Sequence, residues 1–143
     1  MEKTVIVFRA RSTCNDLKLN VSVNHSTVLT PVLDSDFREF AFDINEVDNT
    51  INSISFEMTG KTADHTRIDN NGNILSDQVI EIESLSFDGI GLGELFFQKS
   101  CYQHDFNGSQ SLSNHRFYGT MGCNGVVELE FSSPGYIWLL ENM

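Results

Sequence analysis

Residues 53–58 read SISFEM, and this stretch decides the fold. Its apolar members, Ile54, Phe56 and Met58, alternate with two serines and a glutamate. Only an extended strand places residues i and i+2 on the same side of the backbone. The stretch therefore predicts a β-strand with one face buried and one face in water.

The same alternation recurs along the chain, and no comparable stretch carries a helical apolar stripe. The predicted strands are residues 3–11, 17–23, 28–32, 37–44, 51–58, 78–87, 92–97, 115–118, 126–131 and 136–140. Residues 24–26 are expected to form the turn of one hairpin. Pro31 is expected to end the return strand of this hairpin or to place it at a sheet edge. In residues 78–87 the apolar positions change from even to odd numbers, and a bulge near Ser84 would bring them to one face. Nine or ten short strands predict an all-β fold, an antiparallel β-sandwich of jelly-roll type, with a closed barrel as the alternative.

A chain of 143 residues is expected to form one domain, spanning residues 1–143. The polar stretch of residues 64–77 is expected to project from it as a hairpin, with Ile68 to Leu75 exposed. Asn71 and Gly72 are typical of a two-residue type I′ turn, which requires two residues with positive φ.

The formal net charge of −11 limits the partners. A surface this acidic repels phosphate backbones, so we expect no nucleic-acid binding. No apolar run approaches the roughly 20 residues that span a bilayer, so no membrane insertion is expected. The apolar run of residues 5–8 is also too short for a secretory signal.

Nothing in the chain predicts catalysis, and we expect it not to be an enzyme. Cys14, Cys101 and Cys123 form no metal motif, and no general base is placed beside them by the sequence. His104 and Asp105 are adjacent, so on a strand they would point to opposite faces. Their expected role is to form a turn before Asn107 and Gly108.

The 64–77 stretch also offers a candidate calcium site. Asp69, Asn71, Asn73 and Asp77 supply carboxylate and amide oxygens around Gly72. Ca²⁺ takes about six to eight oxygen ligands in proteins. The alternative interpretation is a plain Asn-Gly hairpin whose polar side chains are solvated.

Two further groups of residues are candidates for binding. Tyr102 and Tyr118 lie beside polar loops and are predicted to be exposed and to contact a ligand. Trp138, Leu139 and Leu140 belong to the apolar C-terminal run and are predicted to form an assembly interface, burying upwards of roughly 1,000 Å² in total.

The first half of the chain carries a family resemblance. Residues 5–11 (VIVFRAR), residues 17–24 (LKLNVSVN), the strand 37–44 and a later strand ending Phe87-Asp88-Gly89 resemble the calcium-dependent carbohydrate-binding modules of the β-sandwich kind. The resemblance covers about residues 3–90. It implies a β-sandwich that binds polysaccharide with the help of Ca²⁺.

The last third reads differently and ends in the apolar run YIWLL, residues 136–140. Small acidic all-β chains of this kind are similar to accessory structural proteins of tailed bacteriophages. This resemblance implies a structural or decorating subunit of a phage particle, in contact with other virion proteins in a homo- or hetero-oligomeric assembly and assembled in the host cytoplasm. We take this as the first functional hypothesis and calcium-assisted carbohydrate binding as its alternative.

Overall fold

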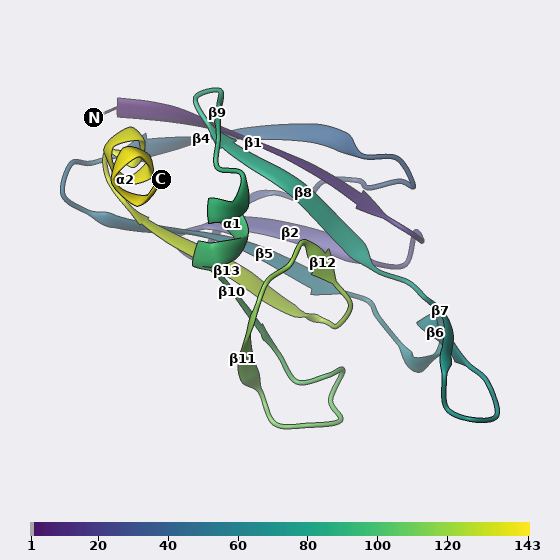
Figure 1. Ribbon diagram of the computed structural model, residues 1–143. Helices are drawn as coiled ribbons and strands as arrows, with labels where there is room; N and C mark the ends of the chain where they lie inside the picture. The colour runs from purple at the N-terminus through teal and green to yellow at the C-terminus, as the bar shows by residue number, and fades with distance from the viewer. Residues whose placement is uncertain (1) are drawn as a thin grey trace.

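Two antiparallel sheets packed face to face form the body of the molecule (Figure 1). The computed structural model describes residues 2–143, and side chains from residue 3 onward. The first sheet has the order β12-β8-β1-β4, with β9 paired to β8. Its strands are β1 (Glu2–Ser12), β4 (Arg38–Glu46), β8 (Ile80–Phe87), β9 (Ile90–Gly91) and β12 (Thr120–Met121). The predicted antiparallel β-sandwich is confirmed.

The second sheet has six strands in the order β11-β10-β13-β5-β2-β3. They are β2 (Lys18–Val23), β3 (Ser26–Leu29), β5 (Ile51–Thr59), β10 (Ser100–His104), β11 (Ser113–Arg116) and β13 (Gly125–Ser132). The predicted hairpin is β2–β3, and β3 lies at the sheet edge and ends two residues before Pro31. Its turn residues Asn24 and His25 both have positive φ.

The core lies between the two sheets and consists of the apolar faces that the alternation predicted. Ile6, Phe8 and Ala10 of β1 are fully buried and face Ile54, Phe56 and Met58 of β5. The rings of Phe8 and Phe56 meet edge to face at 5.2 Å between centroids, and those of Phe87 and Phe131 lie 4.9 Å apart. Such aromatic pairs join one sheet to the other.

The predicted bulge near Ser84 is also present. Arg9 pairs with Ser84 but Ala10 pairs with Ile82, so Glu83 is the extra residue of β8. This extra residue brings Ile82 and Leu85 to the same buried face of the sheet despite their different parity.

Two predicted strands are wrong, because their residues form helices. Residues 94–99 form α1 (Glu94–Lys99), which buries Leu95 and Phe96, and residues 135–142 form α2 (Gly135–Asn142). Residues 136–140 of α2 are all apolar, so the sequence shows neither the helical nor the strand period there. In the structure the helical spacing brings Trp138 and Leu139 to one side, where Trp138 lies 6.1 Å from the rings of Phe87 and Phe131.

A buried carboxylate holds the start of α2. Glu46 is 2% exposed and accepts hydrogen bonds from the hydroxyls of Thr4 (2.6 Å) and Ser133 (3.1 Å) and from the N–H of Gly135 (2.9 Å). A Cβ on Gly135 would lie 3.1 Å from the Glu46 carboxylate. The end of the last strand and the C-terminal helix are thereby tied to β1 and β4.

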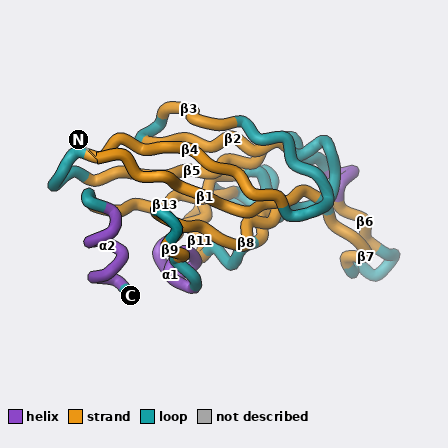
Figure 2. The backbone as a smooth tube through the Cα atoms, turned by 90° about the horizontal axis from the view of Figure 1, so that it is seen from above, coloured by secondary structure: helices purple, strands orange, loops and turns teal. Residues whose placement is uncertain are grey.

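The predicted projecting hairpin is the two-stranded ribbon of β6 (Thr66–Ile68) and β7 (Ile74–Asp77), preceded by the 3₁₀ turn of Ala63–His65. It extends from the end of the sandwich opposite α2 (Figures 1 and 2). The predicted I′ turn is wrong. The Gly72 N–H donates to the Asp69 carbonyl, so Asn70 and Asn71 are the central residues, and Gly72 follows with φ +84°.

Candidate functional site

An exposed aromatic ring marks the candidate site at one edge of the first sheet. Tyr118 is 72% exposed and lies between β11 and β12. Beside it is a shallow pocket of about 190 Å³. The pocket is lined by Phe37, Glu81, Ile82, Glu83, Phe97, Tyr118, Gly119 and Thr120. The exposure predicted for Tyr118 is thus present, together with neighbours that the sequence did not reveal.

Four segments of the chain meet in this pocket: Phe37, residues 81–83, Phe97 and residues 118–120. Thr120 pairs with Glu81 where β12 joins β8, and the Ile82 N–H donates to the Gly119 carbonyl at 2.8 Å. Phe97 comes from α1. Gly119 has φ +101°, and a Cβ there would lie 3.4 Å from the Phe97 ring. The positive φ favours glycine at residue 119, and a Cβ there would already touch the Phe97 ring of α1.

Charged groups are fixed around the aromatic rings. The Arg116 guanidinium lies 5.0 Å from the centre of the Tyr118 ring and covers one of its faces. Glu81 pairs with Arg11 at 3.0 Å, and Glu83 pairs with Arg9 at 2.7 Å. Each carboxylate uses one oxygen in its ion pair. A carboxylate has about four acceptor positions, so both can still accept hydrogen bonds from a ligand.

This pocket combines two chemical capacities. The second face of the Tyr118 ring is available for stacking, since an exposed ring covered on one face leaves the other open. The carboxylates of Glu81 and Glu83 and the hydroxyl of Thr120 supply acceptors and a donor around it. Such a set of groups can hold a small ligand that has an apolar face and hydroxyl groups at its rim.

The prediction for Tyr102 is wrong, because this residue is buried. Tyr102 pairs with Val127, whose side chain faces the core, so the parity of β10 turns the tyrosine inward. Its hydroxyl donates to the Cys123 carbonyl and accepts the Cys123 N–H at 2.9 Å. Burial raises the pKa of this hydroxyl. Tyr102 closes the turn at Cys123 and offers no surface to a ligand.

The four predicted calcium ligands do not converge. Asp69 lies at the tip of the hairpin, where its carboxylate accepts the N–H groups of Asn71 and Asn73, each at 2.9 Å. These hydrogen bonds, that of the Asn73 N–H foremost, hold the pKa of Asp69 below its ordinary value. Asp77 lies opposite Thr66 at the base of the hairpin. The alternative interpretation, a hairpin with self-satisfied side chains, describes Asp69 better.

Asp77 instead forms an ion pair with a buried lysine. The Lys61 side chain is 1% exposed, and its ammonium donates to the Asp77 carboxylate and to the Gln78 carbonyl, each at 2.5 Å. Thr66 also donates to Asp77 at 2.7 Å. Burial alone would raise the pKa of Asp77, but the hydrogen bonds from Lys61 and Thr66 outweigh it and lower the pKa. This pair joins the base of the hairpin to the sandwich.

A different group of ligating side chains lies nearby. Among the described residues, Cys14, Asp16 and His65 are the one set of three or more His, Cys, Asp or Glu side chains whose ligand atoms converge. Thr62 donates its N–H to Nδ1 of His65 at 2.8 Å, and Nε2 lies 3.0 Å from Asp16. The neutral ring therefore carries its proton on Nε2 and donates it to Asp16. One carboxylate, an engaged imidazole and a thiol do not fit Ca²⁺, which takes about six to eight oxygens.

The residues weighed for catalysis have structural roles. His104 accepts the Phe106 N–H at 3.1 Å and stacks on His115 at 4.2 Å, while Asp105 accepts the Gly108 N–H at 2.8 Å. Both therefore form the turn predicted for them. Burial, and then the charge of His115, lower the pKa of His104. Burial raises the pKa of the Cys123 thiol, which disfavours the reactive thiolate.

The predicted interface residues separate into different environments. Leu139 is fully buried in the chain's own core, Trp138 is half-buried against it, and Leu140 is 67% exposed. Only Leu140 has the exposure that the interface prediction required. Within the described residues, no helix has the length and apolar character needed to cross a membrane.

A second polar surface covers the outer face of the six-stranded sheet. Strand register places Asn20, Glu57, Val126, Gln103 and Asn114 in one row across five strands. Two adjoining hollows of about 320 and 210 Å³ share Gln103, Val126 and Glu128. This surface has amides and carboxylates, but its lining residues include no Phe, Tyr or Trp, so it lacks a large stacking platform.

Comparisons with known proteins give a fold. No protein-family model matches the chain, and no curated protein matches it. A solved structure described as "vCBM60 in complex with galactobiose" superposes with a TM-score of 0.59 and 14% identity, over 87% of this chain and 96% of that one. The selenomethionine form of vCBM60, from work linking two families of calcium-dependent carbohydrate-binding modules, gives 0.54 and 13% over 88% and 89%.

The chain has the β-sandwich fold of these modules. The predicted resemblance is thus supported at the level of the fold, and it extends beyond residues 3–90 to most of the chain. At 14% and 13% identity, the likeness shows the fold alone and does not identify a ligand for this chain. Neither of these two structures is described as a phage protein.

Proposed function

We propose that the chain is a non-catalytic carbohydrate-binding domain whose sugar lies against the free face of Tyr118. The observation that carries this proposal is an exposed ring with carboxylate acceptors beside it in one pocket. One face of a pyranose is lined by C–H groups and stacks on an aromatic ring, and its hydroxyls donate to carboxylates. The neighbouring folds, described as carbohydrate-binding modules, support the proposal.

The proposed binding does not use calcium. Calcium dependence is a property of the neighbouring modules, but in this chain the converging ligand set has a single carboxylate. The predicted set of Asp69, Asn71, Asn73 and Asp77 is divided between the two ends of the hairpin. We therefore assign sugar recognition to side chains alone.

A titration with matched variants tests the proposal. Oligosaccharides, galactobiose among them, are first screened on an array, and the best ligand is titrated calorimetrically. Tyr118→Ala should weaken binding at least about tenfold, as expected for the loss of one stacking contact. Tyr136→Ala removes another exposed tyrosine, on α2, and should leave affinity unchanged. An array without any sugar ligand, or equal affinities for the two variants, would contradict the proposal.

The hypothesis of a phage-particle subunit, assembled in the host cytoplasm, stays a prediction. Its one favourable observation is that α2 exposes Leu140 and Tyr136, 67% and 48% respectively. Sedimentation of the chain at increasing concentration tests whether this surface drives self-assembly. A monomer whose state does not change with Leu140→Lys would remove that support.

A further inference from the structure

Cys14, Asp16 and His65 form a cluster of metal-ligating side chains outside the proposed sugar site. Their ligand atoms, a thiol sulfur, a carboxylate oxygen and a ring nitrogen, all lie within 4.8 Å of one another. Zinc bonds of about 2.0–2.3 Å in a tetrahedral arrangement place such ligand atoms roughly 3.5 Å apart. Nε2 of His65 and the Asp16 carboxylate are 3.0 Å apart, so modest side-chain movements bring the three ligands to this spacing.

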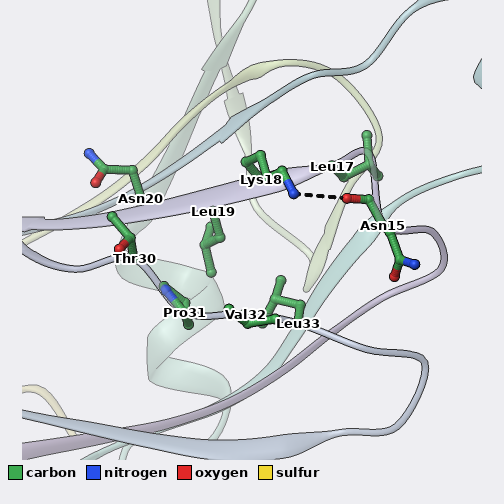
Figure 3. Close-up of a pocket in the computed structure, with 9 residues that line it drawn as sticks. All are labelled: Asn15, Leu17, Lys18, Leu19, Asn20, Thr30, Pro31, Val32 and Leu33. Atoms are coloured by element: carbon green, nitrogen blue, oxygen red, sulfur yellow. Dashed lines mark hydrogen bonds between the residues drawn. The ribbon is translucent and has the colours of Figure 1, made fainter.

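The turn of residues 13–16, between β1 and β2, carries two of these ligands and is held on both sides. On one side, the Thr13 N–H donates to the Val79 carbonyl at 3.0 Å, and the Val79 N–H donates to the Thr13 hydroxyl at 2.8 Å. On the other side, the Lys18 ammonium donates to the Asn15 carbonyl at 3.1 Å (Figure 3). The main chain of the turn is therefore fixed without a metal ion.

The third ligand, His65, is also fixed by its main chain. Its N–H donates to the Thr62 carbonyl at 3.1 Å, and its carbonyl accepts the Gln78 N–H at 2.9 Å. The His65 side chain is 11% exposed, whereas the Asp16 side chain is 76% exposed. The cluster is therefore enclosed on the histidine side and open to solvent on the aspartate side, where an ion can enter and a water molecule can complete its coordination.

The chemistry of the ligands selects the metal. A thiolate and an imidazole favour Zn²⁺ over Ca²⁺ and Mg²⁺, which prefer oxygen ligands. The thiolate and the carboxylate together carry two negative charges, which balance the charge of one Zn²⁺ ion. We propose that Cys14, Asp16 and His65 bind one Zn²⁺ ion, with water as the fourth ligand. The ion would join the turn between β1 and β2 to the base of the β6–β7 hairpin.

Zinc binding moves two protons. The Cys14 thiol releases its proton to solvent, and the thiolate binds the ion. In the metal-free chain Nδ1 of His65 accepts the Thr62 N–H at 2.8 Å, so the ring proton is on Nε2. When Nε2 binds zinc, this proton moves to Nδ1, where the Thr62 hydroxyl lies 3.2 Å away and can accept it. The change of tautomer at His65 is a specific signature of the proposed site.

Zinc titration of matched cysteine variants is the first test. The reduced wild-type chain, Cys14→Ser and Cys101→Ser are titrated with Zn²⁺ in competition with a chromophoric chelator. Cys14→Ser should weaken zinc binding at least about a hundredfold, because it removes a ligand. Cys101→Ser alters a cysteine outside the cluster and should bind zinc as the wild type does. Absence of zinc binding to the wild type, or unchanged affinity in Cys14→Ser, would overturn the proposal, the second by assigning the ion to other surface groups.

The second test separates a metal ligand from a hydrogen-bond acceptor. In Asp16→Asn the side-chain oxygen can still accept the Nε2 proton of His65, but the neutral amide is a poorer ligand for zinc. Zinc affinity should therefore fall at least about tenfold, although the metal-free variant keeps this hydrogen bond. Zinc at a hundred times its Kd should raise the folding constant of the wild type about a hundredfold in denaturant unfolding. Wild-type zinc affinity in Asp16→Asn, or no stabilisation of the wild type by zinc, would overturn the proposal.

Spectra of the bound metal provide the third test. With Co²⁺ in place of Zn²⁺, a thiolate-to-cobalt charge-transfer band should appear in the wild type and in Cys101→Ser, and be absent from Cys14→Ser. Nitrogen-15 spectra should show the His65 ring proton on Nε2 in the metal-free chain and on Nδ1 with zinc. A proton that stays on Nε2 with zinc bound would overturn the proposal. The Tyr118 pocket contains none of the three ligands, so failure of the zinc site and failure of sugar binding are distinguishable.

Discussion

The Tyr118 pocket and the β6–β7 hairpin contain similar polar residues, but only the pocket leaves them available. In the pocket, the carboxylates of Glu81 and Glu83 each make one ion pair and lie beside an exposed ring. In the hairpin, Asp69 accepts the turn's own N–H groups, and Asp77 holds a buried lysine. A carboxylate-rich sequence therefore marks a binding site only where the fold does not already satisfy those carboxylates.

The largest effect is expected at the base of the hairpin. Lys61→Met should lower the free energy of unfolding by about 3 kcal/mol, because it leaves the partly buried Asp77 without its cation. Denaturant unfolding measures this loss. Lys99→Met, at an exposed lysine, is the control and should change stability by less than about 0.5 kcal/mol. Equal effects of the two variants would mean that the pair does not anchor the hairpin.

Two glycines with positive φ provide a matched pair. Gly119→Val should cost about 2 kcal/mol, because a valine would be strained at φ +101° and would also crowd the Phe97 ring. Gly72→Val meets no atom within 4 Å and should cost only the strain, about 1 kcal/mol. Sugar titration separates the two regions further, since only the Gly119 variant should lose affinity. Loss of sugar binding in the Gly72 variant would contradict the assignment of the site.

Acid should weaken the base of the hairpin through Asp77. The folded state lowers the pKa of Asp77 below 3.8, so the unfolded state binds a proton more readily. The stabilising contribution is therefore complete above that ordinary pKa and is lost as the pH falls through the lower folded value. The protection factor of the Thr66 amide, which is its exchange rate corrected for the intrinsic effect of pH, is followed from pH 6 to pH 2.5 and should fall only below about pH 3.8. A transition near neutral pH would contradict this origin.

The smallest effect distinguishes a turn residue from a metal ligand. Asp69→Ala should lower the melting temperature slightly, because two N–H groups of the turn lose their acceptor. The size of the drop should be the same with millimolar calcium and with EDTA. A drop that appears only in calcium would restore Asp69 to the metal site that the sequence predicted.

The sequence predicted the sandwich well, because period two is visible wherever one face of a strand is buried. It missed α1 and α2 for a physical reason. In α2 the run of residues 136–140 is apolar at every position, so only Pro134 and the packing of Trp138 on Phe87 reveal which side is buried. Short helices of this kind are determined by what they pack against.

The candidate site could be predicted only in part. Tyr118 was found from its polar neighbours, but the same argument failed for Tyr102, whose orientation depends on pairing with Val127. Phe97 and Glu81 lie in other segments and reach Tyr118 through the pairing of β12 with β8. Strand order is a long-range property that local alternation does not contain.

The most direct measurement is a nuclear Overhauser effect between Tyr118 and a bound sugar. The chain is labelled at tyrosine ring carbons, and the best ligand from the array is added at saturating concentration without calcium. If the sugar stacks on Tyr118, cross-peaks join the sugar C–H protons to the ring of Tyr118, and none join them to Tyr136 on α2. Cross-peaks to Tyr136 alone, or cross-peaks to Tyr118 that vanish with EDTA, would contradict the proposed binding.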